Sequence, residues 1–142
     1  MKLEVDDHEF QLKMRKIDEQ VLEELIDAMN DAVDDLVRIS SSIAPIDKGI
    51  LRKSSDRQVK QSADGIQGEV SYQAVEQSPN YGRFDYAIWT HEYMTGLGPR
   101  SQASPGTDGY VVGRKYLTRP LQGESPKYVK WFQEALEKGV DG

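Results

Sequence analysis

A long helical repeat of apolar residues near the N-terminus limits the folds that this chain can adopt. Apolar side chains recur there at steps of three and four: Phe10, Met14, Ile17, Val21, Leu25, Met29, Ala32, Val33 and Leu36. This spacing places them on one face of an α-helix. Residues 1–5 fit a short strand before this repeat. Asp6, followed three residues later by Glu9, resembles a capping box, and Pro45 disfavours helical geometry in the residue before it. We therefore predict a helix over about residues 7–43.

The opposite face of this predicted helix is acidic. It carries Asp18, Glu19, Glu23, Glu24, Asp27, Asp31, Asp34 and Asp35, with no Lys or Arg among them. Like charges four residues apart repel on a helix, so these carboxylates do not stabilise the isolated helix. We interpret them as a solvated or partner-facing surface, on which Asp27, Asp31 and Asp34 are candidates for subunit contacts.

The residues after Pro45 predict a sheet and then a second helix. Apolar and polar residues alternate over residues 66–74, which is typical of a half-buried strand, and short turns between strands favour antiparallel pairing. The predicted sheet covers about residues 55–121, with a Gly- and Pro-rich mobile loop at 96–109. Tyr110 to Val112 form either a short strand or the ordered end of that loop. Ser125 as N-cap and Pro126 at the first helical position predict the start of a C-terminal helix over about residues 126–139, which either Gly139 or Gly142 ends.

Together these segments predict an α+β fold in a single domain that spans residues 1–142. The length of 142 residues suits one domain better than two. An antiparallel β-sheet packed against a long N-terminal helix and a C-terminal helix would bury the apolar faces of all these elements.

Composition narrows the classes of function. The chain has no cysteine, which excludes disulfides and thiolate metal sites. No apolar run approaches the roughly 18 residues of a membrane helix, and the N-terminus lacks a signal-peptide apolar region. The net charge of −6 disfavours broad nucleic-acid binding, because an acidic chain gains no affinity from counterion release. We expect a protein made in the cytoplasm, without a cofactor and without a membrane partner.

The candidate catalytic residues do not form a recognisable site. His91 and Glu92 lack the second histidine of a zinc-protease helix, and no serine lies in a nucleophile elbow. We therefore predict that the chain is not an enzyme, with no catalytic and no metal-binding residues. Two alternatives stay open. One is a small metal-dependent hydrolase that uses His91, Glu92 and Asp85. The other is a cytoplasmic regulatory protein whose acidic helix binds a basic partner.

Three segments, in order, resemble one known family. They are Ala-Pro-Ile-Asp-Lys-Gly-Ile-Leu-Arg-Lys-Ser at 44–54, Tyr-Ala-Ile-Trp-Thr-His-Glu-Tyr-Met-Thr-Gly at 86–96, and Lys-Tyr-Leu-Thr-Arg-Pro-Leu at 115–121. The first follows the long helix and the last precedes the C-terminal one. This order resembles the small head–tail joining, tail-completion and minor capsid proteins in the neck of long-tailed bacteriophages and prophages.

The resemblance implies a structural virion protein at the head–tail junction, assembled in the cytoplasm of the bacterial host. It implies a fold similar to tail-terminator proteins and a ring, hexameric in the virion, that contacts adjoining neck or tail-tube proteins. DNA would pass through the ring without specific binding. The family has no catalytic residues to carry over. Whether the chain is a terminator, a stopper or another minor capsid protein stays open.

Charged residues within the three motifs are further candidates for subunit contacts. They are Asp47, Arg52, Lys53, Glu92 and Arg119. We expect Arg52 and Lys53 to be free to meet a neighbouring subunit. Arg119 would either pair with a carboxylate or be simply exposed. The acidic helix face and the basic segment at 48–60 are complementary, and head-to-tail contacts between unlike patches close into rings when the rotation allows it.

Overall fold

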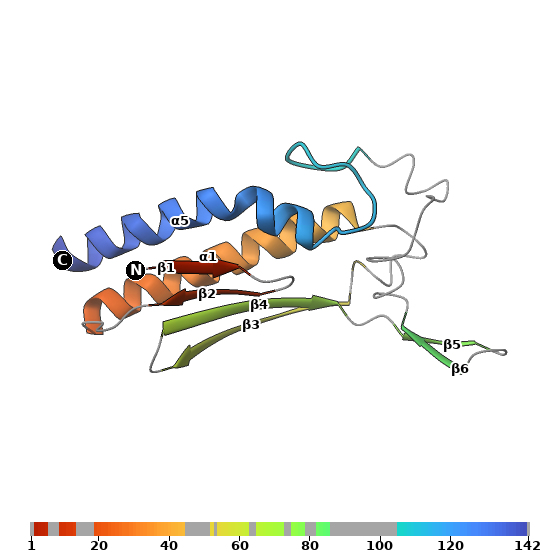
Figure 1. Cartoon of the computed structure of the whole chain (residues 1–142), viewed down its shortest axis with the longest axis horizontal. Coiled ribbons are helices and arrows are strands. Elements are labelled where there is room, and N and C mark those ends of the chain that lie inside the picture. The colour runs from red at the N-terminus through yellow and green to blue at the C-terminus, as the bar shows by residue number, and fades with distance from the viewer. Residues whose placement is uncertain are drawn as a thin grey trace.

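The computed structural model has two layers, a β-sheet and a pair of helices on one of its faces (Figure 1). The structure describes residues 2–5, 9–13, 19–44, 52, 54–62, 65–72, 75–78, 82–85 and 105–141. The elements in chain order are β1 (Lys2–Val5), β2 (Glu9–Lys13), α1 (Glu19–Ile43), β3 (Ser55–Ser62), β4 (Gly65–Tyr72), β5 (Val75–Ser78), β6 (Gly82–Asp85) and α5 (Thr118–Asp141). This arrangement confirms the predicted α+β class.

The main sheet is antiparallel and has four strands in the order β1-β2-β4-β3. Strands β5 and β6 pair only with each other, in a separate two-stranded sheet. Strand β3 begins at Ser55, as predicted, and β1 lies where the sequence fits a short strand over residues 1–5. The prediction was wrong in two places: residues 9–13 form a strand of the main sheet, and residues 118–121 belong to a helix.

The first helix begins at Glu19, not near residue 7 as predicted. Phe10 and Leu12, two residues apart, are each 1% exposed, and the strand that carries them pairs with β1 and β4. Phe10 and Met14 fit a helical step of four, but Phe10 and Leu12 fit a strand equally well. Pairing on both sides decides for the strand, because it satisfies the backbone groups of this segment. The C-terminal end of α1 at Ile43 confirms the predicted end.

The last helix begins at Thr118, eight residues before the predicted start. Pro120 lies in its first turn, where a missing N–H costs nothing. Pro126 lies inside the helix and has no N–H to donate to the carbonyl of Gln122. The hydroxyl of Ser125 donates to that carbonyl instead, at 3.0 Å. Ser125 is therefore not the N-cap that we predicted, but a local replacement for the missing helical hydrogen bond.

Of the two glycines expected to end this helix, Gly139 does not end it. The helix continues to Asp141, and Gly139 is buried against α1. A Cβ atom at Gly139 would lie 2.7 Å from the Cα atom of Val21. Glycine is needed here for a close approach of the two helices and not for a turn.

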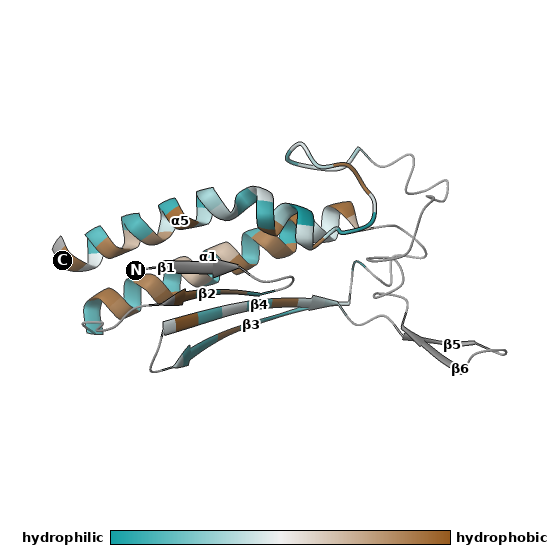
Figure 2. Ribbon diagram, in the orientation of Figure 1, coloured by the Kyte–Doolittle hydropathy of each residue, from teal (hydrophilic) through white to brown (hydrophobic). Residues whose placement is uncertain are grey.

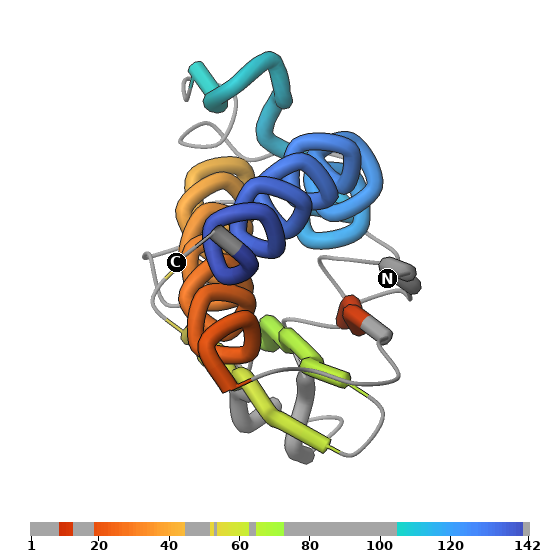
Figure 3. The backbone as a smooth tube through the Cα atoms, turned by 90° about the vertical axis from the view of Figure 1, so that its left-hand side faces the viewer, coloured from red at the N-terminus to blue at the C-terminus, as the bar shows by residue number. Residues whose placement is uncertain are grey.

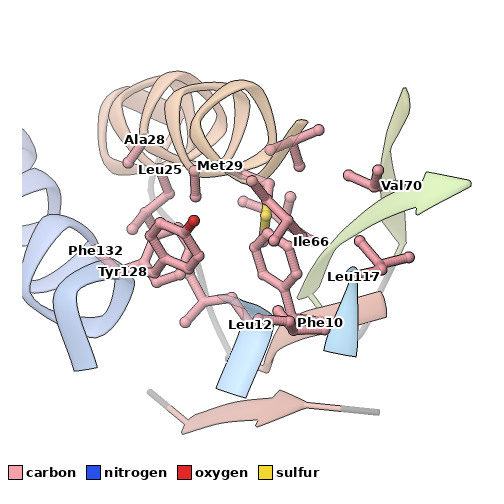
Figure 4. Close-up of a cluster of buried hydrophobic side chains, with 14 of the residues drawn as sticks. Phe10, Leu12, Leu25, Ala28, Met29, Ile66, Val70, Leu117, Tyr128 and Phe132 are labelled. Carbon is pink, nitrogen blue, oxygen red and sulfur yellow. The ribbon is translucent and has the colours of Figure 1, made fainter. Parts of the chain in front are cut away.

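The core lies between the helix pair and one face of the sheet (Figures 3 and 4). Phe10 from β2 stacks on Tyr128 from α5, with 5.8 Å between the ring centroids. Figure 4 shows that side chains of both helices and both central strands meet there. The labelled members are Phe10, Leu12, Leu25, Ala28, Met29, Ile66, Val70, Leu117, Tyr128 and Phe132. The buried residues of α1 are thus the apolar face that the sequence predicted.

The other face of the sheet is polar along its two central strands. The side chains of Glu9, Gln11, Gln67 and Glu69 alternate with the buried residues of β2 and β4. The amide of Gln67 donates to Glu9 Oε2 at 2.6 Å across the strands. Both helices lie on the opposite face, and hydrophilic colour marks much of β3 in Figure 2. Any partner that contacts this face would meet polar groups.

Candidate interaction surfaces

A groove with a cavity volume of about 760 Å³ opens between α1 and α5. Its lining comes from one face of each helix, because the lining residues follow one another at helical steps. They are Glu24, Asp27, Ala28, Asn30 and Asp31 from α1, and Trp131, Glu134, Ala135 and Lys138 from α5. The partly buried indole of Trp131 and the two alanines supply apolar surface among charged groups.

The groove is strongly acidic. Four carboxylates and one lysine line it, and the lysine Nζ of Lys138 lies 3.5 Å from Glu24 Oε2. Asp27 and Asp31 are exposed, and neither forms an ion pair within the described part of the chain. These two predicted contact residues are therefore placed side by side on a concave surface. Their role in subunit contacts stays a prediction.

Asp34, the third acidic candidate, is paired within the chain. Its side chain is 64% exposed, and Arg57 Nε from β3 lies 2.9 Å from Asp34 Oδ1. Arg57 Nη2 also donates to Asn30 Oδ1 at 2.5 Å. Part of the acidic helix face thus pairs with the basic 48–60 segment of the same chain and not with that of a neighbouring subunit. Asp34 is less suited to a subunit contact than Asp27 or Asp31.

Asp35 holds the two helices together and is not a solvated acid of the helix face. Lys127 Nζ lies 2.7 Å from its Oδ2, and Tyr128 donates a hydrogen bond of 2.9 Å to the same oxygen. Arg38 donates to the other oxygen at 2.9 Å. Burial opposes ionisation of Asp35, but the hydrogen bonds from Lys127, Arg38 and Tyr128 outweigh it and lower the pKa of the carboxyl.

An ordered turn precedes α5, where the sequence predicted a mobile loop at 96–109. Residues 96–104 lie outside the described residues, but residues 107–110 form a turn closed by two backbone hydrogen bonds between Thr107 and Tyr110. Arg38 donates to Asp108 Oδ2 at 2.8 Å, and this hydrogen bond, with another from Thr107, lowers the pKa of Asp108 to about 2. Of the two options for residues 110–112, the structure has the ordered loop end and no strand.

Arg119 fixes the segment that follows this turn. Its Nε donates to the carbonyl of Arg114 at 2.9 Å, and its Nη2 donates to the carbonyl of Val111 at 3.0 Å. Within the described residues Arg119 thus pairs with backbone carbonyls that no regular element pairs, and not with a carboxylate. A carboxylate partner in a neighbouring subunit stays a prediction. Burial lowers the pKa of Arg119, although it stays charged. We call residues 110–114 the braced loop.

The braced loop presents one apolar and one basic side chain to solvent. Val111 is 70% exposed, while the neighbouring Val112 is 6% exposed and packs inward. The guanidinium of Arg114 is exposed and has no hydrogen bond or ion pair within the described residues. The N–H of Gly113 donates to the carbonyl of Ile43 at 3.0 Å, which ties the loop to the end of α1.

Arg52 is not free to meet a neighbouring subunit, contrary to expectation. Its Nε donates to the carbonyl of Ala44 at 2.8 Å, and its Nη2 is buried without a partner. Burial lowers the pKa of Arg52. A carbonyl near the end of α1 takes this side chain because the last carbonyls of a helix have no helical donor.

The remaining predicted positions lie outside the described residues. These are Asp47, Lys53, His91 and Glu92. Asp85 is the last residue of β6, but its side chain is not described. The hydrolase alternative therefore stays a hypothesis. Of the three motifs that resemble the phage family, only 115–121 is described throughout.

The described residues contain neither a group of metal ligands nor a membrane-spanning helix. No group of three or more His, Asp or Glu residues is placed to hold a metal ion there. No helix in the same residues has the length and apolar character to cross a membrane. Comparisons with known proteins found no matching family model, no matching curated protein and no matching solved structure.

Sequence reasoning missed the groove and the braced loop as sites. Trp131 was visible as an aromatic residue on the last helix, and its spacing to Ala135 and Lys138 places them on one face. The facing residues of α1 are about a hundred positions away, so no local pattern joins the two sides. Arg119 was identified, but its backbone acceptors depend on the path of the loop.

Proposed function

We propose that the chain is a structural virion protein of a bacteriophage neck or tail, which assembles into a ring at the head–tail junction and catalyses nothing. The order of the three family-like segments supports this proposal. Its partners are further copies of the same chain and the adjoining neck or tail-tube proteins.

The observation that carries the proposal is the set of unpaired carboxylates in the helix groove. Asp34 and Asp35 are neutralised by Arg57, Arg38 and Lys127 of the same chain. Asp27 and Asp31 lie on the same helix and are left without a partner among the described residues. Unpaired charge around an aromatic residue in a concave surface fits a protein–protein contact, in which charge fixes partner and orientation.

A ring also gives a use to acidic residues outside the contacts. Carboxylates that line the opening of a ring repel the phosphates of DNA as it passes, because both groups are negatively charged and lie close together in a narrow channel. Glu19 and Glu23 are exposed on the first turns of α1 and suit this role.

One alternative has an observation in its favour. A regulatory protein that binds a basic host partner would also need an acidic groove. The two functions differ in stoichiometry: a ring contains many copies of the chain, whereas a regulator forms a complex with a different protein. No described geometry supports a hydrolase, because His91 and Glu92 lie outside the described residues.

The test is to delete the gene from the phage or prophage that encodes it and to examine the lysate by electron microscopy. We expect filled heads and tails that do not join, and infectivity that returns when the wild-type chain is supplied. A variant with Asp27→Lys and Asp31→Lys should not restore joining. The matched control is Glu137→Lys, an exposed carboxylate of α5 outside the groove, which should restore it. Fully infectious particles from the deletion would contradict the proposal.

A further inference from the structure

We propose that the braced loop of one copy docks into the helix groove of a second copy. Val111 would contact Trp131 and the neighbouring alanines, and the guanidinium of Arg114 would pair with Asp27 and Asp31. The inference deepens the proposed function and rests on it, because the occupant of the groove is another copy of this chain.

The loop has the properties of an inserting segment. Its backbone is held by the guanidinium of Arg119 at two carbonyls and by the hydrogen bond from Gly113 to Ile43. A segment already fixed in one conformation loses little entropy when it binds. Val111 lies in this fixed loop and is nevertheless 70% exposed. Its apolar side chain is therefore available for contact with another molecule.

The groove has the complementary properties. Ala28 and Ala135 leave room beside Trp131 for an apolar side chain, and carboxylates surround that surface. An apolar anchor at the centre of a charged rim is the usual anatomy of an energetically important contact. An arginine at the edge of the loop suits this rim, since its guanidinium can pair with carboxylates through two hydrogen bonds.

The braced loop and the groove lie toward opposite ends of the helix pair, so the loop of one copy cannot reach the groove of the same copy. Arg119, which holds the loop, is at the start of α5, and Trp131 lies twelve residues further along. At ~1.5 Å per residue, about 18 Å of helix separates them. Figure 1 shows the loop segment near the start of α5, whereas the groove residues follow toward its end. Contacts between such unlike surfaces repeat from copy to copy, as a ring requires.

The first experiment is a charge exchange, read by the mass of the purified chain in solution. Arg114→Glu alone, or Asp27→Arg with Asp31→Arg, should raise the dissociation constant of self-association by about tenfold or more. Combining all three substitutions in one chain should restore most of the loss. Lys130→Glu and Glu23→Arg are matched controls on exposed residues outside both surfaces and should have little effect.

The second experiment traps the contact. The chain has no cysteine, so single cysteines report only the designed pair. A size-tagged Val111→Cys chain mixed with an untagged Asp31→Cys chain should form a tagged–untagged disulfide under mild oxidation. The same mixture with Glu23→Cys should not. Equal cross-linking of the two mixtures would overturn the proposal, as would a wild-type chain that stays monomeric at millimolar concentration.

The outcomes separate this inference from the proposed function. If the chain is required for head–tail joining but the charge exchange and the cross-link fail, the loop–groove contact is wrong and the virion role stands. If the exchange and the cross-link succeed but phages without the gene assemble normally, the contact is right and the virion role is wrong.

Discussion

Gly68 lies where α1 crosses β4, and its missing side chain lets the helix come close to the sheet. A Cβ atom there would lie 2.7 Å from Met29 Sδ, 2.8 Å from Val33 Cγ2 and 3.2 Å from Phe10 Cζ. These neighbours come from the helix and from the adjacent strand and are all buried, so a side chain at this position would force them to shift within the core. A single residue thereby sets the distance between the two layers of the fold.

We predict that Gly68→Val lowers the free energy of unfolding by about 1–3 kcal/mol, because extra atoms in a packed core force shifts of side chains and backbone. Urea unfolding followed by circular dichroism measures this change. Gly113→Ala is the matched control, since its nearest foreign atom would be Arg119 Nη2 at 3.7 Å. A Gly68→Val variant as stable as the wild type would show that α1 does not sit this close to β4.

At the scale of the elements, Asp35 is a polar tie between α1 and α5. It accepts hydrogen bonds from two residues of α5 and one of its own helix, and its side chain is only 13% exposed. Since these bonds lower its pKa in the folded protein, the carboxylate stabilises the fold above its unfolded pKa. That stabilisation is lost as the pH falls below the usual aspartate pKa of 3.8 and through the lower folded value.

We predict that Asp35→Asn destabilises the protein at pH 7 by about 1.5–3 kcal/mol, the range for hydrogen bonds to a charged group. The difference between variant and wild type should shrink as the pH falls from 5 toward about 2, because the wild-type carboxyl becomes protonated there. Thermal unfolding across this pH range provides the measurement. Asp31→Asn, an exposed carboxylate of the same helix, serves as the control. A difference that stays constant with pH would rule out the charged tie.

Some boundaries of the helices could be predicted from the sequence, and others could not. The apolar repeat of α1 and its end before Pro45 followed from periodicity and the geometry of proline, and the α+β class followed from the order of the patterns. The start of α1 did not, because Phe10 fits a helical and a strand repeat alike until its partners in β1 and β4 are known. The start of α5 was missed because Ser125 and Pro126 imitate a helix start.

The candidate site was harder to predict than the fold. Asp27 and Asp31 were identified as surface acids from their spacing, whereas Asp35 looked the same in sequence and proved to be a helix–helix tie. What distinguishes them is Lys127 and Tyr128, more than ninety residues away. Long-range partners of this kind are set by how the helices cross, which no local pattern records.

At the scale of the whole molecule, charge is distributed unevenly over the helix layer. The groove near one end is acidic, and the braced loop near the other end carries an exposed arginine. Because these charges are exposed, salt screens them over a Debye length of about 10 Å at 0.1 M. The core between the layers is buried and apolar, and salt affects it much less.

We therefore predict that self-association weakens as the NaCl concentration rises. The dissociation constant should increase by about tenfold between about 0.05 M and 0.5 M NaCl, while the free energy of unfolding of each subunit changes little. Sedimentation velocity at several protein concentrations measures the association, and urea unfolding at each salt concentration is the control. Association that strengthens with salt would indicate an apolar interface instead.

The position of β3 at one margin of the sheet affects how copies of the chain avoid one another. An unpaired strand margin offers backbone donors and acceptors to any similar strand and can seed uncontrolled aggregation. Here that margin bears Asp56, Arg57, Gln58, Lys60, Gln61 and Ser62, all exposed to solvent. Another strand would have to strip water from these groups before it could pair. A protein that assembles at high local concentration into a particle of fixed size benefits from an edge strand that does not readily pair with other strands.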